Sequence, residues 1–452
     1  MSALWSPQAL TAATGAACGF AADGVSIDSR SVGPGELFVA LETETGDGHR
    51  FVPAALARGA AGALVHRDLA DVAPEQVLRV GDTLAGLADL GRFARARFTG
   101  QLVAITGSVG KTTTKEMLRR ILAAQGPTHA AHASYNNQWG LPLTLTRMPE
   151  RAAFCVAEIG MNHAGEIAPL ARLARPHLAL ITTIGTAHVG HLGSLAAIAA
   201  EKASIAEGLE PGGTLIVPTD APHRDLLEAG GHRVLRFGPG GDARITSMQA
   251  DAEGTAIQAD VLGVAVTLHL AAPGAHMAAN ALGALLAAAV LGVRPEAAAA
   301  ALSGFAAVDG RGAQRRIAVP GGHALLLDES YNASTIAVRA ALAVLRLLPA
   351  RRRVVVLGDM REMGEAGPAE HLSLTEDVAA TADVVFACGP LTGLLFAALP
   401  DAIRGAQAET SDALAPLVAA ALRDGDAVLV KGSLGMKMQA IVDAIAAPME
   451  AH

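Results

Sequence analysis

The stretch Leu102-Val-Ala-Ile-Thr-Gly-Ser-Val-Gly-Lys-Thr-Thr-Thr114 decides the fold of this 452-residue chain. It contains an apolar run typical of a strand, a glycine-rich turn, a lysine, and hydroxyl residues that open a helix. Gly107 and Gly110 allow the backbone to turn tightly and direct its N–H groups inward. Lys111 adds a mobile positive charge, and Thr112 offers an oxygen to Mg²⁺. This order predicts a phosphate-binding loop for a nucleoside triphosphate.

The loop departs from the full pattern G-x-x-x-x-G-K-[ST], because the first glycine would fall at Ile105. The surrounding sequence compensates for this departure. Apolar residues between Met117 and Leu122 recur at helical spacing, and Gly126-Pro127 ends the helix. The strand, loop and helix therefore favour a phosphate loop over a chance glycine-rich turn.

Composition limits the classes of function. The net charge of −8 argues against a nucleic-acid binder. Cys18, Cys155 and Cys388 are too far apart for a metal site, and their odd number suits buried core thiols in a reducing cytosol. No basic-then-apolar leader opens the chain, and the apolar run 281–293 is too short to span a bilayer. We therefore expect a cytoplasmic protein without membrane insertion, in which this run forms a buried helix.

The length suggests about three domains, and the pattern of strands predicts that all three are α/β. Residues 1–100 mix short strands, such as 35–41, with helices, such as 53–58, and predict a small domain. Residues 101–308 hold the phosphate loop within an alternation typical of a mostly parallel sheet. Its further strands are predicted at 154–157, 178–182 and 214–217.

Residues 309–452 repeat the alternation of strands and helices and predict a Rossmann-like domain. Its strands are predicted at 324–328, 354–358, 384–387 and 427–430. The sequence G-x-G-x-x-G follows none of these strands, which argues against NAD. Ligands are still expected at the carboxyl ends of the strands.

Three polar residues of the central domain are candidates for chemistry. Glu158 follows the strand 154–157, and His188 lies in a loop after the strand 178–182, at the edge where open α/β sheets bind ligands. Each can hold a metal, or can equally be a helix cap or a hydrogen-bonded polar residue. Lys202 lies among apolar neighbours of a helix, and its spacing favours a lysine that extends to the surface. A buried lysine, in contrast, has a lowered pKa, and its neutral amine can form a Mg²⁺-binding carbamate with carbon dioxide.

The chain resembles the Mur ligases, the ATP-dependent amide-forming enzymes of peptidoglycan precursor synthesis. Their variant phosphate loop, T-G-[ST]-x-G-K-[ST], matches residues 106–112 and explains the absent first glycine. Their S-Y-N-N…G-x-P segment matches residues 134–142, so the resemblance implies that Asn136 and Asn137 contact substrate. It also places the family's glutamate, histidine and carbamylated lysine on Glu158, His188 and Lys202. The carbamate thereby becomes the favoured interpretation of Lys202.

The resemblance extends across the second domain junction. Residues 274–280 resemble the family's G-x-H-x-x-x-N, whose asparagine helps to hold ATP, and Arg311 resembles the linker arginine that reaches the phosphates. Residues 328–334, Asp-Glu-Ser-Tyr-Asn-Ala-Ser, resemble the D-D-S-Y-N-A-N segment that contacts nucleotide. With Leu-Gly-Asp-Met at 357–360, they are similar to the branch that adds a dipeptide last, not to siblings with a D-Y-A-H version. The implied nucleotide-binding residues are Thr106, Gly107, Ser108, Val109, Gly110, Lys111, Thr112, Thr113, Asn280, Arg311, Asp328, Tyr331 and Asn332.

The match departs from the family pattern in three places. Glu329 replaces the second aspartate, Ser334-Thr335 replaces Asn-Pro, and Ser134 replaces the first asparagine of N-x-N-N. None of these changes removes a phosphate or metal ligand, so we interpret them as variation within the branch. A D-N-P-R-type segment, expected in a diaminopimelate-adding sibling, is absent from the sequence.

The N-terminal domain resembles the uridine-nucleotide domain of the same branch. The similar segments are Asp28-Ser-Arg30, residues 35–41 and Asp47-Gly-His49. The resemblance implies that Ser29, Arg30, Asp47 and His49 hold the UDP part of the substrate. A guanidinium can fork across two diphosphate oxygens, although an ordinary surface arginine remains the alternative for Arg30.

The implied activity is ATP-driven amide synthesis, in which UDP-N-acetylmuramoyl-tripeptide is activated as an acyl phosphate and receives D-alanyl-D-alanine. The implied catalytic residues are Lys111, Glu158, His188 and Lys202. Two Mg²⁺ sites are implied, with ligands among Thr112, Glu158, His188 and carbamylated Lys202. Lys431 and Ser433, which follow a strand and are predicted to open a helix, would bind the dipeptide carboxylate, or form a plain turn.

We expect a monomer whose three domains close around the substrates, because an acyl phosphate must be shielded from water. Three alternatives stay open. One is a sibling ligase that adds a single amino acid, or a folylpolyglutamate synthetase. The second is a nucleotide sensor without catalysis, for which a second metal site would have no use. The third is a P-loop kinase, for which a UDP-type domain would have no use.

Overall fold

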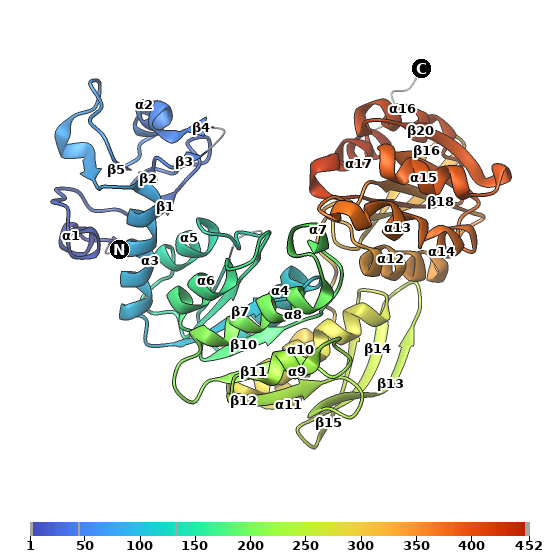
Figure 1. The fold of residues 1–452 in the computed structure, drawn as a ribbon, viewed down its shortest axis with the longest axis horizontal. Helices are drawn as coiled ribbons and strands as arrows, with labels where there is room; N and C mark the ends of the chain where they lie inside the picture. Colours follow the sequence, from blue (N-terminus) through green and yellow to red (C-terminus); the bar gives the residue numbers. More distant parts are fainter. Residues whose placement is uncertain (1–2, 44–45, 132–133, 448–452) are drawn as a thin grey trace.

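The protein has three α/β domains arranged as an open V (Figure 1). The structure is a computed structural model and describes residues 3–43, 46–131 and 134–447. The N-terminal and C-terminal domains form the two arms, and the central domain joins them at the base. The predicted fold class is therefore confirmed. The predicted limits near residues 100 and 308 fall between the sheets of the domains, and they stay predictions.

The N-terminal domain is built on a four-stranded parallel sheet in the order β1-β2-β5-β6. Its apolar side chains, such as Leu37 and Leu64, are fully buried against helix α3 and the start of the chain. The elements are α1 Pro7–Thr14, β1 Gly24–Ser26, β2 Glu36–Val39, β3 Glu42–Thr43, β4 Gly46–Asp47, α2 Val52–Ala57, β5 Gly62–Val65, β6 Val77–Arg79 and α3 Thr83–Arg97.

The central domain contains a nine-stranded sheet in the order β15-β14-β13-β12-β11-β10-β7-β9-β8. The strands are parallel from β8 to β13, as predicted, but β13, β14 and β15 form an antiparallel extension that the sequence analysis missed. The strands are β7 Gln101–Thr106, β8 Thr128–Ala130, β9 Phe154–Glu158, β10 Leu178–Ile181, β11 Thr214–Pro218, β12 Arg233–Phe237, β13 Ala243–Ala250, β14 Thr255–Val261 and β15 Val264–Leu270. The helices are α4 Lys111–Ala123, α5 Gly140–Thr146, α6 Ile167–Ala174, α7 Val189–Leu192, α8 Leu195–Ala203, α9 Arg224–Glu228, α10 Ala275–Val290 and α11 Pro295–Leu302.

The C-terminal domain contains a six-stranded sheet in the order β16-β17-β21-β18-β19-β20. The four predicted strands are present, and β16 and β20, which were not predicted, form the two edges. The strands are β16 Ala313–Val319, β17 Gly322–Glu329, β18 Arg352–Gly358, β19 Val384–Cys388, β20 Arg404–Ala408 and β21 Asp426–Lys431. The helices are α12 Thr335–Leu347, α13 Gly367–Leu372, α14 Thr375–Ala379, α15 Pro390–Ala398, α16 Ser411–Ala421 and α17 Gln439–Ala446.

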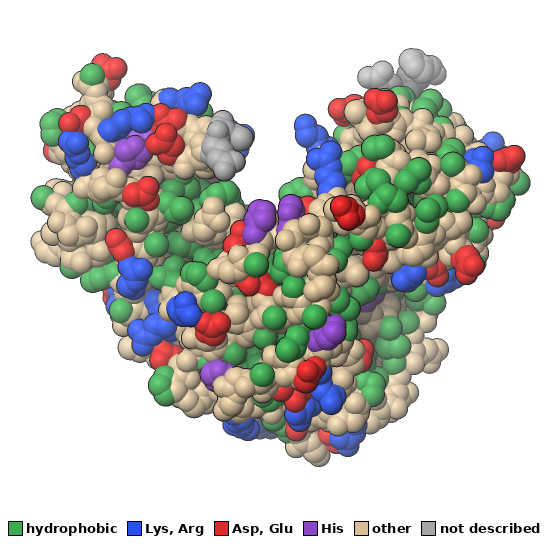
Figure 2. Space-filling view, viewed as in Figure 1, with side chains coloured by type: hydrophobic (Ala, Val, Ile, Leu, Met, Phe, Trp, Pro, Cys, Tyr) green, Lys and Arg blue, Asp and Glu red, His purple; other side chains and the backbone are tan. Residues whose placement is uncertain are grey.

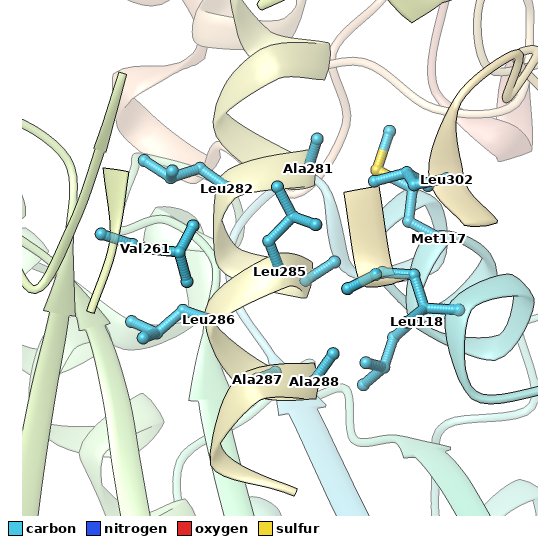
Figure 3. Close-up of a cluster of buried hydrophobic side chains, with 14 of the residues drawn as sticks. Met117, Leu118, Val261, Ala281, Leu282, Leu285, Leu286, Ala287, Ala288 and Leu302 are labelled. Carbon is cyan, nitrogen blue, oxygen red and sulfur yellow. The ribbon is translucent and has the colours of Figure 1, made fainter. Parts of the chain in front are cut away.

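Helix α10 forms the core beneath the sheet of the central domain (Figure 3). Residues 281–290 of the apolar run predicted to be a buried helix lie in α10, where Leu282, Leu285 and Leu286 are almost fully buried, and residues 291–293 follow its end. Its apolar side chains pack with those of α4 on one side and of the antiparallel strands on the other. Among the described residues, no helix is long and apolar enough to cross a membrane.

The cysteines only partly match the prediction of core thiols. Cys155 and Cys388 are buried, and burial raises the pKa of their thiols to about 12 and about 11. Cys18 is only half-buried at the edge of the N-terminal core, so the prediction was wrong for this residue. Its place in a loop between α1 and β1 leaves one side uncovered.

The N-terminal domain is joined tightly to the central domain. Helix α3 packs on α5, where a Cβ at Gly91 would lie 3.2 Å from the Cα of Pro142. The Trp5 indole donates to the Thr146 carbonyl over 3.0 Å, and the guanidinium of Arg97 lies 4.4 Å from the Trp5 ring centroid. The arm thus rests on packed side chains and not on a linker alone.

Leu285→Ala should lower the free energy of unfolding of the central domain by about 2–5 kcal/mol, since it leaves a cavity in a closely packed core. The matched control is Leu226→Ala on the surface helix α9, where the side chain is 36% exposed and the expected change is within about 0.5 kcal/mol. Chemical denaturation followed by tryptophan fluorescence measures both. Equal losses in the two variants would contradict this view of α10.

Candidate functional site

A cleft of about 1550 Å³ lies between the arms of the V and is lined by all three domains (Figure 2). Histidine side chains are visible at the base of the notch. Most of the predicted site residues come together here, namely Ser108, Val109, Gly110, Lys111, Thr112, Thr113, Asn136, Asn137, Glu158, His188, Lys202, Asn280, Arg311, Tyr331, Asn332, Lys431 and Ser433. Thr106, Gly107, Asp328, Ser29, Arg30, Asp47 and His49 lie outside its lining.

The phosphate loop connects β7 to α4 and depends on two glycines. Gly107 has a φ of +147°, and a Cβ there would lie 1.9 Å from Thr182 Oγ1. Gly110 has a φ of +87°, and a Cβ there would lie 2.4 Å from Asn280 Oδ1. Any side chain would therefore both strain the backbone and collide with a neighbour. Asn280 touches the loop directly, as its predicted role requires.

The end of strand β10 supports the loop from the other side. The N–H of Val109 donates to Thr183 Oγ1 over 3.0 Å, and the hydroxyl of Thr182 donates to the Val109 carbonyl over 2.5 Å. Both threonines line the cleft, and the sequence analysis missed them. The available signal was their position at the end of the predicted strand, since Thr182 is its last residue and Thr183 follows it.

Lys111 is the first residue of α4 and bends back over the loop. Its Nζ donates to the Gly107 carbonyl over 2.7 Å. Burial lowers the pKa of Lys111, Glu158 opposes this, and the positive charge of Arg311 adds to it. An anion at the N-terminus of α4 would offset the positive charges of Lys111 and Arg311. It would also accept hydrogen bonds from the N–H groups of the first helical turn.

Glu158 and Thr112 place two oxygen atoms side by side at the floor of the cleft. Glu158 is 1% exposed; its Oε2 accepts from Thr112 Oγ1 over 2.9 Å, and its Oε1 accepts from Asn136 Nδ2 over 2.7 Å. A carboxylate next to a hydroxyl, close to a phosphate loop, is a donor set that suits Mg²⁺. Asn136 holds the carboxylate in place through its amide.

Ser134, where the family carries asparagine, lies within this group. Its Oγ is 3.1 Å from Thr112 Oγ1 and accepts from Arg311 Nη2 over 2.9 Å. The guanidinium of Arg311 lies 4.0 Å from the ring centroid of Tyr331. A hydroxyl at this position therefore links the candidate metal ligand Thr112 to the linker arginine, which the sequence did not indicate.

Lys202 is 1% exposed, so the spacing argument that favoured a surface lysine was wrong. Its helix, α8, lies with Ile198 and Ala199 against the core, and the lysine extends from there to the cleft. Burial lowers the pKa of Lys202 well below its usual value, and the charge of Lys111 lowers it further. Among the described residues, no hydrogen bond to its Nζ is formed. A buried amine with a lowered pKa beside the cationic Lys111 suits conversion to an anionic carbamate.

His188 has a φ of +65° and forms the N-cap of the short helix α7. Its Nδ1 lies 2.6 Å from Oε2 of Glu362, which comes from the C-terminal domain. The nearby His188 side chain lowers the pKa of Glu362, although burial opposes this. The sequence analysis missed Glu362, because its contact joins residues that are far apart in the chain. In the described part of the chain, no group of three His, Cys, Asp or Glu residues is placed to hold a metal.

The Mg²⁺ sites implied by the resemblance do not consist of His, Cys, Asp and Glu alone. They also use the hydroxyl of Thr112 and a carbamate on Lys202. The residues present fit hard cations. Glu158 and Thr112 supply adjacent oxygen atoms, and Lys202 supplies the amine from which a carboxylate-like ligand can form. His188 has one ring nitrogen paired and leaves the other for a ligand.

One predicted residue of the C-terminal domain, Asp328, is used within the fold. Asp328 is fully buried; its Oδ2 accepts from Arg315 Nη2 over 2.9 Å, and its Oδ1 accepts from the hydroxyl of Ser330 over 2.6 Å. It thus shapes the segment that carries Tyr331 and Asn332, and it does not itself line the cleft. The predicted contact of Asp328 with nucleotide is untested.

Lys431 and Ser433 line the cleft, but the local structure differs from the prediction. Lys431 Nζ donates to Glu329 Oε2 over 2.9 Å and to the Asn332 carbonyl over 3.1 Å. Ser433 Oγ accepts from the Arg361 N–H over 2.8 Å. A short 3₁₀ helix, Leu434–Met436, follows instead of an α-helix, because Lys437 takes a left-handed conformation and ends it.

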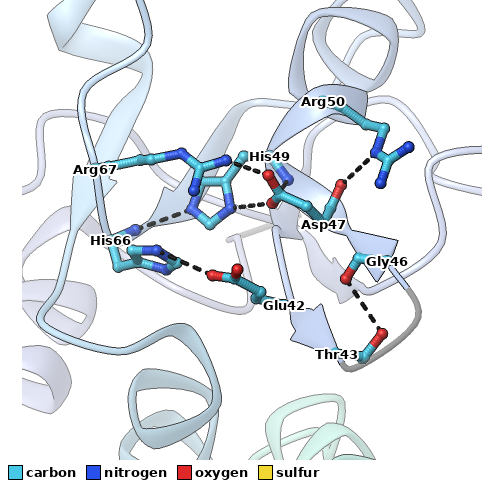
Figure 4. A network of polar contacts seen from close by, with 8 residues as sticks. All are labelled: Glu42, Thr43, Gly46, Asp47, His49, Arg50, His66 and Arg67. Atoms are coloured by element: carbon cyan, nitrogen blue, oxygen red, sulfur yellow. Dashed lines mark hydrogen bonds and ion pairs between the residues drawn. The ribbon is translucent and has the colours of Figure 1, made fainter.

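Two of the predicted UDP-binding residues, Asp47 and His49, belong to a polar network beside β3 and β4 (Figure 4). The buried His49 has Nδ1 2.8 Å from Asp47 Oδ1, and the His66 N–H donates to His49 Nε2 over 3.2 Å. Burial opposes ionisation of Asp47, but hydrogen bonds from His49 and Arg67 lower its pKa to about 2. Glu42, which pairs with His66 over 3.3 Å, belongs to both this network and the cleft lining.

Arg30 and Ser29 lie apart from this network. Arg30 forks across its neighbour Asp28, with distances of 2.9 and 2.8 Å, and its side chain is 88% exposed. Ser29 is half-buried in the same turn. The proposed contact of the Ser-Arg pair with a diphosphate stays a prediction, since Arg30 would have to exchange its carboxylate partner for the ligand.

Gly107→Ala should weaken Mg-ADP binding by about fivefold or more, because strain and collision at this backbone position cost about 1–3 kcal/mol. Equilibrium dialysis or calorimetry measures the dissociation constant. Gly19→Ala is the control, since no atom lies within 4 Å of a Cβ placed there. Unchanged binding in Gly107→Ala would remove the loop from the nucleotide site.

Comparisons with known proteins agree with this geometry. The Mur ligase family catalytic domain matches residues 22–93, the Mur ligase middle domain matches 105–288, and the Mur ligase glutamate ligase domain matches 315–434. The UDP-N-acetylmuramoyl-tripeptide–D-alanyl-D-alanine ligase of Escherichia coli strain K12 is 34% identical, covering 94% of this chain and 93% of its own. The ligase of that name from Bacillus subtilis strain 168 is 34% identical, with 94% of each chain covered.

Solved structures with the same architecture include two of the MurF ligase. The first is MurF from Acinetobacter baumannii, with a TM-score of 0.86, 30% identity and 98% of each chain covered. The second is MurF from Thermotoga maritima in complex with ADP, with a TM-score of 0.80, 25% identity, and 94% of this chain and 97% of that chain covered. On the identity of its relatives and the share of the chain that they cover, this protein belongs to the Mur ligase family.

Proposed function

We propose that this protein is an ATP-dependent ligase that joins D-alanyl-D-alanine to UDP-N-acetylmuramoyl-tripeptide. The single observation that carries the proposal is the floor of the cleft, where a phosphate loop, the Glu158–Thr112 pair and the buried Lys202 come together between three domains. Relatives that bear the name of this reaction match the chain over 94% of its length, which supports the choice of substrates.

The chain's own groups can bind and orient the triphosphate of ATP. The loop N–H groups and the N-terminus of α4 face the phosphates, and Lys111 and Arg311 offset their charge. Asn280, in contact with the loop, and Tyr331, stacked on Arg311, border the same space. Mg²⁺, held by Thr112 and Glu158 and in a second site by His188 and carbamylated Lys202, would neutralise charge that develops on the phosphates.

Activation of the substrate carboxylate explains why an ATP site is needed. A carboxylate is a poor electrophile toward an amine at neutral pH. Attack of one carboxylate oxygen on the γ-phosphorus releases ADP and leaves an acyl phosphate. The amine of D-alanyl-D-alanine then attacks the carbonyl carbon, and phosphate leaves with the carboxylate oxygen. Lys111 and Arg311 favour both steps, because charge builds up on phosphate oxygens in each.

The domains divide the substrates between them in this proposal. The N-terminal domain, residues 1–100, holds the UDP part near Asp47 and His49, and residues 101–308 bind ATP. Residues 309–452 present D-alanyl-D-alanine from the wall near Lys431 and Ser433. One chain supplies every wall of the cleft, so we propose a monomer that acts in the cytoplasm.

Product formation with defined acceptors tests the proposed function. Purified protein with ATP, Mg²⁺ and UDP-N-acetylmuramoyl-tripeptide should release phosphate only when D-alanyl-D-alanine is present, and mass spectrometry should detect the pentapeptide product. Single amino acids are the matched control acceptors. Turnover only with a single amino acid would assign the protein to a sibling reaction, and no turnover with any acceptor would favour a sensor.

Lys202→Ala should lower kcat at least about tenfold, as loss of a metal-supporting group does, and short carboxylic acids should restore part of the activity. The added carboxylate would fill the place of the carbamate. Lys437→Ala, at an exposed position of the C-terminal domain, is the control and should keep full activity without any response to the acid. Full activity of Lys202→Ala would rule out the carbamate.

A further inference from the structure

The contact between His188 and Glu362 crosses the boundary between the central and C-terminal domains. His188 precedes α7 of the central domain, and Glu362 follows β18 of the C-terminal domain. Their side chains meet at 2.6 Å between Nδ1 and Oε2, with His188 15% and Glu362 42% exposed. Both residues line the cleft, so the contact lies at the candidate site itself.

The backbone at this contact is built to bring the two segments together. His188 and Glu362 both have left-handed backbone conformations, with φ of +65° and +68°. Such conformations are unfavourable for residues other than glycine and cluster at functional sites. The Gly190 N–H donates to the Glu362 carbonyl over 3.0 Å. A Cβ at Gly190 would lie 2.3 Å from the backbone nitrogen of Gly364, so only glycine allows this approach.

The geometry points to Glu362 as a positioning residue that orients His188 for ligand binding and makes this orientation depend on the placement of the C-terminal domain. This inference rests on the proposed function, in which His188 supports the second Mg²⁺. With a carboxylate oxygen 2.6 Å from Nδ1, the tautomer that carries its proton on Nδ1 is favoured, and Nε2 then keeps its lone pair for a metal. Because Glu362 belongs to the domain proposed to bind the dipeptide, it would couple the placement of the dipeptide to activation of the substrate carboxylate.

A second contact at the same boundary allows the positioning role to be separated from simple domain adhesion. Glu370 accepts from Thr186 Oγ1 over 3.3 Å and from Thr335 Oγ1, and it makes no contact with His188. Glu370→Gln weakens the boundary but leaves the imidazole partner in place. Glu365→Gln, at an exposed neighbouring position outside the cleft lining, controls for the loss of one negative charge.

Mn²⁺ binding, measured by electron paramagnetic resonance on the full chain with a non-hydrolysable ATP analogue, tests the inference without turnover. Glu362→Ala should weaken one class of Mn²⁺ site about tenfold, the usual effect of removing a carboxylate behind a metal-binding histidine. The other class should be unchanged. In ligation assays, the Mg²⁺ concentration for half-maximal rate should rise by the same factor, with the KM for D-alanyl-D-alanine less affected.

Glu362→Gln keeps the size of the side chain and one acceptor oxygen, so its loss of Mn²⁺ affinity should be smaller. The melting temperature of this variant shows whether the altered segment still folds. Wild-type Mn²⁺ affinity in both Glu362 variants would overturn the inference, as would an equal loss in Glu370→Gln or the absence of a second Mn²⁺ class in the wild type. Failure of the proposed function would appear differently, as a lack of pentapeptide product from the wild-type protein.

Discussion

The structure depends on an imbalance of buried charge at the floor of the cleft. Lys111, Lys202 and Arg311 converge on a region where Glu158 is the buried carboxylate, and both lysines have lowered pKa values. Burial of positive charge is costly, so this part of the cleft favours the binding of anions. Polyphosphate and carbamate are anions of the kind that this region can stabilise. ATP binding, carbamate formation on Lys202 and phosphoryl transfer then all follow from the need to place anions beside these positive side chains.

The rest of the fold holds these groups in place. Gly107 and Gly110 permit the approach of the loop to Thr182 and Asn280, and the core around α10 fixes the helix that carries Asn280. The N-terminal arm is joined to the central domain by packed aromatic and aliphatic side chains. The C-terminal arm meets the central domain near the cleft through polar and backbone contacts and through Val189, which packs on the core of the C-terminal domain. Polar contacts exchange partners more readily than a packed core does, which suits an arm that must admit and enclose substrates.

Sequence alone predicted the three α/β domains and the phosphate loop, because strand–loop–helix order and glycine placement are local signals. Most of the other predicted residues that meet in the cleft came from the resemblance to the Mur ligases, whose motifs they match. It could not predict interactions that depend on the tertiary fold. Spacing suggested a surface position for Lys202, although burial of α8 is set by the sheet beneath it. Glu362, Thr183 and the antiparallel strands β13–β15 were missed, and the helix expected after Lys431 is a short 3₁₀ turn. Arg30, expected at a diphosphate, pairs locally with Asp28.

The central claim is that the cleft transfers a phosphoryl group from ATP to the substrate carboxylate before the amide forms. Ligation with UDP-N-acetylmuramoyl-tripeptide labelled with ¹⁸O in its terminal carboxylate tests this most directly. The account predicts that the released inorganic phosphate carries an ¹⁸O atom taken from the carboxylate, as nuclear magnetic resonance or mass spectrometry of the phosphate would detect. Amide product accompanied by unlabelled phosphate would contradict the acyl phosphate and, with it, the role assigned to the charged floor.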